Sequence, residues 1–256
     1  MQNPLDLLGS KPRRVAGVGV CAAACLTLMS LSGLARVRPA ADTQTRDDNQ
    51  WTRHFSEAAS DFASTGRNPY FVLEPGYVLT FQGTEEGVKA DLTITVLGET
   101  LMVDGVETRV VEERESHEGK LVEVSRNYFA ISKRTNNVYY FGEDTDTYEN
   151  GAVVNHEGSW RSGSGGATYG LAVPATAMVG ARFYQEVSPN VAMDRVEIVS
   201  TSETASVPAG QFKDCVKTEE TTPLEPGEKE YKVYASGVGL VIDGTLKLVK
   251  HGFLKK

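Results

Sequence analysis

The fold is decided by residues 77–96, YVLTFQGTEEGVKADLTITV. Tyr77, Leu79 and Phe81 alternate with residues of a second face, and the same period of two returns in the second half of the stretch. This period places successive side chains on opposite faces of a β-strand. Between the two halves, residues 84–87 (TEEG) supply a turn. The stretch therefore predicts two antiparallel strands with one buried face.

The same alternation extends over most of the chain after residue 66. Further strands are expected at 106–116, 120–133, 137–142, 152–160, 195–206, 211–219, 229–235, 238–242 and 245–250. About ten short strands at this spacing predict an all-β protein, either an antiparallel sandwich or an open half-barrel. Because 40% of the chain is apolar, it has enough apolar residues for one hydrophobic core. We expect residues 66–256 to form a single β domain.

Two segments before the domain lack this alternation. Residues 36–50 are rich in Pro, Ala, Thr, Gln and Asp without an apolar period, which is typical of a linker. In residues 51–65 the spacing places Trp51, Phe55 and Phe62 on one helix face. We therefore predict a short helix there, packed on the edge of the domain.

The N-terminus carries a targeting pattern. Residues 15–35 contain no charge and follow the basic stretch Lys11-Pro-Arg-Arg14. This order, with small residues at Gly33-Leu34-Ala35, is typical of a signal peptide. The alternative is an uncleaved membrane anchor, because a helix over residues 15–35 spans roughly 31 Å. Both interpretations predict a β domain outside the cytoplasm: periplasmic, extracellular or anchored to the cell membrane.

Charge and cysteine content limit the partners and the chemistry. The net charge is −8, and because residues 1–35 carry +2, the rest carries −10. A part of the chain with this much negative charge repels the phosphate backbone of nucleic acids, so no nucleic-acid partner is expected. Cys21 and Cys25 lie in the apolar segment, which leaves Cys215 alone in the domain. No disulfide within the domain is expected, and Cys215 is predicted to be a buried, unreactive thiol.

Residues 143–182 are rich in glycine and show little strand pattern, so a long loop is expected. At its start lie the oxygen-bearing side chains Glu143, Asp144, Asp146, Glu149 and Asn150. Ca²⁺ prefers several oxygen ligands from one tight loop, although the spacing is not that of an EF-hand. These five residues are the candidate metal site, with Ca²⁺ as its ion. The alternative interpretation is a solvated acidic turn.

The commoner catalytic motifs are missing. His117-Glu118 and His156-Glu157 lack a second histidine at helical spacing, so the zinc-protease motif is absent and both histidines are expected in solvated turns. Ser164 lacks the glycine that a nucleophile elbow requires two positions earlier. No phosphate loop or dinucleotide fingerprint is found, so no nucleotide cofactor is expected. A non-enzymatic role is favoured, with catalytic residues unknown.

Several short motifs mark the domain. They are Asn68-Pro-Tyr-Phe71 with Leu73-Glu-Pro-Gly76, Tyr140-Phe-Gly-Glu-Asp144, Gly158-Ser-Trp160, Val207-Pro-Ala-Gly210, Pro223-Leu-Glu-Pro-Gly227 and Tyr234-Ala-Ser-Gly-Val-Gly-Leu-Val241. Together they resemble a large family of bacterial exported β-rich proteins of unknown function. The last pattern also looks like the LolA-like half-barrel fold, which hosts lipid and lipoprotein carriers. The resemblance spans roughly residues 67–250 and implies no catalytic residues.

Function classes of different kinds remain open. The favoured one is an envelope protein that binds an apolar ligand or a protein partner in its sheet concavity, and that contacts the membrane through residues 15–35 if these stay uncleaved. The alternatives are a hydrolase with dispersed catalytic residues and a calcium-stabilised secreted structural protein. A wide apolar cavity would favour the first class, and a strongly shifted carboxylate or histidine in a cleft would favour a hydrolase.

Overall fold

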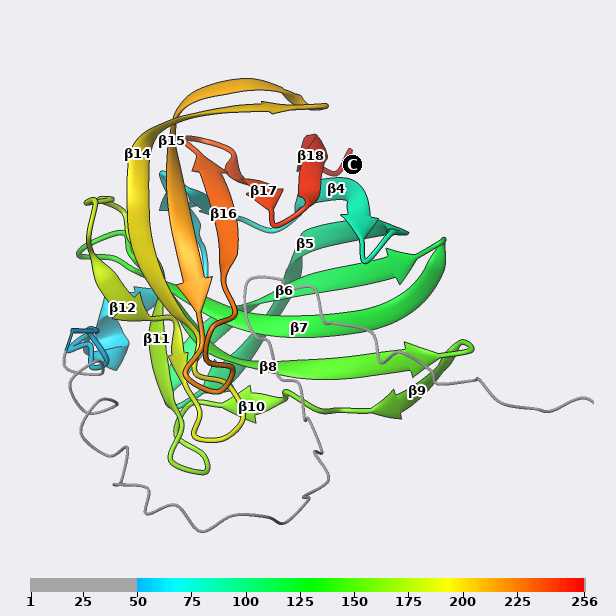
Figure 1. Ribbon diagram of the computed structural model, residues 1–256. Helices are drawn as coiled ribbons and strands as arrows, with labels where there is room; N and C mark the ends of the chain where they lie inside the picture. The colour runs from blue at the N-terminus through cyan, green and yellow to red at the C-terminus, as the bar shows by residue number, and fades with distance from the viewer. Residues whose placement is uncertain (1–49, 256) are drawn as a thin grey trace, which may run out of the picture.

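A computed structural model of the protein describes residues 50–255. This part is all-β: one large antiparallel sheet curves into a nearly closed barrel (Figure 1). The one helical element among the described residues is a single 3₁₀ turn, η1. The predicted fold class is therefore confirmed, and the sheet takes the barrel form.

The element bounds in chain order are η1 Ala59–Asp61, β1 Phe62–Ala63, β2 Gly66–Asn68, β3 Phe71–Leu73, β4 Tyr77–Glu85, β5 Val88–Val103, β6 Val106–His117, β7 Lys120–Ser132, β8 Val138–Glu149, β9 Ala152–Asn155, β10 Trp160–Arg161, β11 Thr168–Val173, β12 Arg182–Tyr184, β13 Glu186–Val187, β14 Arg195–Val207, β15 Gly210–Thr221, β16 Glu230–Ala235, β17 Gly239–Asp243 and β18 Leu246–Phe253. The long strands β4 to β8 and β14 to β18 lie where the period of two predicts strands.

Two series of antiparallel hairpins build the barrel. One series is β4 to β8, the other is β14 to β18, and β18 pairs with β4 to join them. In Figure 1, β6 to β8 run across the picture, and β14 to β16 are steeply inclined to them. The two ends of the sheet order, β12 and β13, are separated in the chain by Gln185 alone. Because β12 pairs with β14 and β13 pairs with β11, residues 182–187 bring the two ends of the sheet together.

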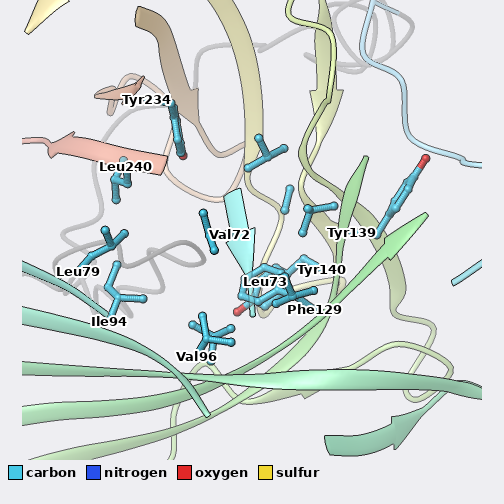
Figure 2. Close-up of a cluster of buried hydrophobic side chains, with 14 of the residues drawn as sticks. Val72, Leu73, Leu79, Ile94, Val96, Phe129, Tyr139, Tyr140, Tyr234 and Leu240 are labelled. Atoms are coloured by element: carbon cyan, nitrogen blue, oxygen red, sulfur yellow. The ribbon is translucent and has the colours of Figure 1, made fainter. Parts of the chain in front are cut away.

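The hairpin β2–β3 fills part of the concavity, and we call it the plug. Val72 and Leu73 of the plug belong to the same buried cluster as Ile94 and Phe129 of the barrel wall (Figure 2). Fully burying a side chain of this size contributes about 1.5–3 kcal/mol. The side-chain amide of Asn68 also donates hydrogen bonds to two backbone carbonyls of surrounding segments. Apolar packing and these hydrogen bonds hold the plug inside the barrel.

The helix predicted over residues 51–65 is wrong. Apart from the single 3₁₀ turn η1 the segment is not helical, and its later part forms β1, which pairs with β7. Trp51 packs edge-on against Tyr184, and Phe55 packs edge-on against Tyr139. These two sites lie on different strands of the barrel, so an extended chain reaches both. Tertiary packing of the aromatic rings overrides the helical spacing.

The long loop predicted at residues 143–182 is also wrong. Strand β8 continues to Glu149, and β9, β10 and β11 follow it. The strand predicted at 152–160 is present in part, as β9 and β10 at its two ends, and both pair with β8. Strand β11 was not predicted, because its last four residues are all buried and do not alternate. For these reasons the described residues contain more strands than expected.

The signal peptide or anchor predicted at residues 1–35 and the linker predicted at 36–50 lie outside the described residues, apart from Gln50. Within residues 50–255, no helix combines the length and the apolar character needed to cross a membrane.

Candidate functional site

Acidic side chains gather at one end of the barrel interior, and we call this set the acidic end. It consists of Glu85, Glu113, Glu115, Glu123, Glu220, Glu230 and Asp243. These carboxyl groups lie close enough to influence one another electrostatically. One fully buried cation, Lys232, lies among them, with its Nζ 3.1 Å from Glu220 Oε2 and 3.5 Å from Asp243 Oδ1. Carboxylates therefore outnumber cations at this end of the interior.

Three side chains of two different strands meet above β5. The strand register pairs Ala90 of β5 with Gly83 of β4 on one side and with His117 of β6 on the other. Residues two apart in a strand share a face, so Glu115 lies beside His117, and Glu85 lies beside Gly83. The outer strands are about 10 Å apart, since neighbouring strands are spaced by about 4.8 Å. Because Ala90 is small, the longer side chains can approach each other in the space above β5.

The polar atoms of Glu85, Glu115 and His117 converge. His117 Nε2 is 2.6 Å from Glu115 Oε1 and 3.4 Å from Glu85 Oε2. The side chains are 19% exposed for His117, 15% for Glu85 and 8% for Glu115. Within the described part of the chain, this is the group of metal-ligating side chains whose ligand atoms all lie within 4.8 Å of one another. We call it the Glu-Glu-His cluster.

The protonation of the cluster follows from its burial. Burial, and then the charge of Glu85 and its neighbours, raises the pKa of Glu115 to about 9. Burial, and then Asp243, raises the pKa of Glu85 to about 7. Burial lowers the pKa of the His117 imidazole. At neutral pH the contact between Glu115 and His117 is therefore a contact between uncharged groups, and the cluster holds protons that a cation can displace.

This protonation makes stability depend on pH. We expect the free energy of unfolding to fall as pH rises from about 5 to about 9. Glu85 and Glu115 keep their protons in the folded state at a pH where the unfolded chain, with pKa values near 4.3, has released them. The stabilisation is complete below the unfolded pKa and is lost as pH rises through the folded pKa, by about 1.4 kcal/mol per pH unit for each group.

Urea unfolding at pH 5, 7 and 9 measures this slope. The Glu115→Gln variant is the control, because its amide does not titrate and its profile should be flatter. A wild-type stability that rises over this range would contradict the expected protonation.

Two small cavities lie next to the plug, and Tyr70 and Tyr234 border both of them. Their volumes are about 10 and 30 Å³, and most of their lining is apolar. The larger one reaches Glu113 of the acidic end. A cavity of roughly 10–15 Å³ holds one water molecule, so both accept molecules of about that size in this conformation.

The five residues of the predicted calcium site are not brought together. They lie on strand β8 and its turn, not on a loop, so their side chains alternate between the two faces. Glu143 is 2% exposed and lies in the interior. Asp144 forms a two-bond ion pair with Arg161, at 2.6 and 2.7 Å, and this pairing lowers its pKa. Asp146, Glu149 and Asn150 follow toward the exposed turn, and calcium binding there stays a prediction.

The two histidines expected in solvated turns differ. His156 is exposed, with Nδ1 2.7 Å from Asp146 Oδ1. The expectation for His117 is wrong, because this residue ends β6 with its side chain toward the interior. Cys215 is fully buried, as predicted, and burial raises the pKa of its thiol.

The Glu-Glu-His cluster was missed by the sequence reasoning, although part of its signal is present. Glu113 and Glu115 lie in the strand predicted at 106–116, and His117 follows directly after it. The three residues stand two apart, so they share one face if the strand continues to His117. Treating His117 as a turn residue hid this pattern. Glu85 comes from a strand on the far side of β5, and no local spacing links it to the others.

No protein-family model, curated protein or solved structure matches the chain. The resemblance to bacterial exported proteins and to the LolA-like fold therefore stays a prediction, and the site is interpreted from its own geometry.

Proposed function

We propose that the protein is an exported, non-enzymatic binding protein that takes a cation at the acidic end of its barrel. The observation that carries this proposal is the convergence of Glu85, Glu115 and His117 on one point of the interior. Neither carboxyl group has a lysine or arginine within 4.0 Å among the described residues, and His117 is the partner of both. Ionising such carboxyl groups costs free energy, which a bound cation offsets. Export rests on the uncharged residues 15–35.

The apolar-ligand carrier expected from the sequence has weaker support. Its ligand would have to enter cavities of about 10 and 30 Å³ beside a plug that is packed and hydrogen-bonded in place. Apolar ligands of drug size occupy pockets of roughly 300–1,000 Å³. A carrier role therefore requires the plug to leave the barrel, whereas cation binding does not.

A hydrolase is the second candidate, and one observation favours it. Glu115, with a pKa of about 9, lies beside the neutral His117 in a partly open site. Perturbed acid–base pairs of this kind occur at catalytic centres. Cation binding needs no group beyond Glu85, Glu115 and His117, so binding remains the favoured function.

Thermal unfolding of the purified protein, first with a chelator and then with Ca²⁺, Mg²⁺, Mn²⁺ or Zn²⁺, tests cation binding. At ten times its dissociation constant, a bound cation should add about 1.4 kcal/mol of stability. The Glu115→Gln variant should lose this shift, because an amide replaces a charged ligand oxygen. The Asp144→Ala, Asp146→Ala double variant is the matched control and should keep it.

Each outcome separates the alternatives. A shift that is lost in the double variant and kept in Glu115→Gln would place the cation on β8, as the calcium prediction has it. An unchanged midpoint with all four cations would overturn the proposal.

A further inference from the structure

We propose that Glu85, Glu115 and His117 form a site for a divalent transition metal of the zinc class. This inference rests on the proposed function, because it names the chemical class of the cation that the acidic end takes. The residues come from two strands that flank β5, so the fold and not a local motif builds the site.

The spacing of the ligand atoms is the first support. Zinc binds imidazole nitrogen at about 2.0–2.1 Å and carboxylate oxygen at about 2.0–2.2 Å in tetrahedral geometry, which separates neighbouring ligand atoms by roughly 3.4 Å. His117 Nε2 and Glu85 Oε2 are already 3.4 Å apart. Glu115 Oε1 is 2.6 Å from the same nitrogen, and this distance would have to widen for both atoms to bind one zinc ion.

The second support is that two of these atoms make no hydrogen bond. Glu85 Oε2 and His117 Nε2 are both buried, and neither has a hydrogen-bond partner of acceptable geometry. Buried polar atoms in native proteins are almost always satisfied, and a site that binds an ion is one reason for an exception. Glu115, more than nine-tenths buried, directs its Oε1 toward the same nitrogen. The atoms that lack hydrogen bonds are the ones that a metal would join.

The chemistry of the ligands selects the class of metal. Ca²⁺ takes six to eight oxygen ligands, so an imidazole in the centre of the cluster disfavours it. Imidazole suits zinc, copper, iron and nickel, and mixed nitrogen and carboxylate ligands are common for zinc. Two carboxylates also balance the charge of a divalent ion.

Three protein ligands leave one position of a tetrahedral metal open. Water or a small bound molecule fills such a position in zinc proteins. The side chains of His117 and Glu85 are partly exposed, so solvent can reach the cluster. Asp243 is fully buried and lies close enough to raise the pKa of both Glu85 and Glu115.

Calorimetric titration of the chelator-treated protein with Zn²⁺ and with Ca²⁺ tests the proposal. We expect one Zn²⁺ per chain in the wild type, and a loss of affinity of about 100-fold or more in His117→Gln, since even indirect changes near a metal cost 10–100-fold. The matched control is His156→Gln. It removes an exposed histidine that also contacts a carboxylate, and it should leave Zn²⁺ binding unchanged.

Co²⁺ gives a measurement that needs no variant. Tetrahedral Co²⁺ absorbs visible light much more strongly than octahedral Co²⁺, so wild-type protein loaded with Co²⁺ should show intense bands that Zn²⁺ abolishes. Weak octahedral bands, or equal Zn²⁺ affinity in His117→Gln and the wild type, would overturn the inference. Ca²⁺ or Mg²⁺ binding that depends on Glu115 but not on His117 would overturn it and leave the proposed function standing. No binding of any cation would overturn both.

Discussion

Replacing Lys232 by methionine is expected to lower the free energy of unfolding by about 3–5 kcal/mol at pH 8. Lys232 is fully buried, and burial opposes its charge, but Asp243, Glu220 and Glu230 hold its pKa well above the usual value. Methionine keeps most of the apolar volume and removes the charge. Asp243, also fully buried, is then left without its counter-charge. Urea unfolding, monitored by circular dichroism, measures the loss.

Two further variants test the cause of this loss. Lys247→Met removes an exposed lysine of β18 and should change stability by no more than about 0.5 kcal/mol. Adding Asp243→Asn to Lys232→Met should recover part of the loss, because it removes the uncompensated charge. A Lys232→Met variant as stable as Lys247→Met would contradict the role given to the buried ion pair.

The second large effect is expected from Gly170→Ala, which should cost about 3 kcal/mol. Gly170 lies in β11 at the place where residues 182–187 close the barrel. A methyl group at this position would lie 2.5 Å from the carbonyl oxygen of Tyr184 and would overlap the carbonyl group of Gln185. Both neighbours are backbone atoms, so neither can rotate away, and the two ends of the sheet must separate.

The matched control for this change is Gly98→Ala in β5. A methyl group there meets no atom within 4 Å, and its stability should stay within about 0.5 kcal/mol of the wild type. Thermal unfolding of the two variants provides the comparison. If Gly170→Ala unfolds at the wild-type midpoint, the barrel joint is looser than the structure describes.

Much of the fold could be predicted because the long strands have one apolar and one polar face. The sequence places strands at 106–116 and 120–133, and the structure has β6 and β7 there. The same reasoning fails for β11, whose last four residues are all buried, and for Trp51 and Phe55, whose helical spacing is accidental. The closure of the barrel could not be predicted from the sequence either, because the joint at Gln185 depends on pairings between segments distant in sequence.

The candidate site was less predictable than the fold. Asp144 and Asp146 are close in sequence, and this closeness suggested a shared metal site. In the structure both lie on strand β8, and Asp144 forms an ion pair with Arg161 instead. The Glu-Glu-His cluster needs the register of β4, β5 and β6, and it needs the small Ala90 between them. Spacing of two within a strand reveals Glu115 and His117, but only the assembled sheet adds Glu85.

The pairing of β18 with β4 also sets the order in which the barrel can be completed. Phe253 lies opposite Tyr77, so this contact joins segments from opposite ends of the domain. Contacts between residues so far apart in the sequence form slowly, because a large loop must close before they stabilise the chain. Until the last strand emerges during synthesis, the edge of β4 is open to strands of other molecules. Such a topology favours completion of the whole polypeptide before folding, and protection of the nascent chain from aggregation in the interval.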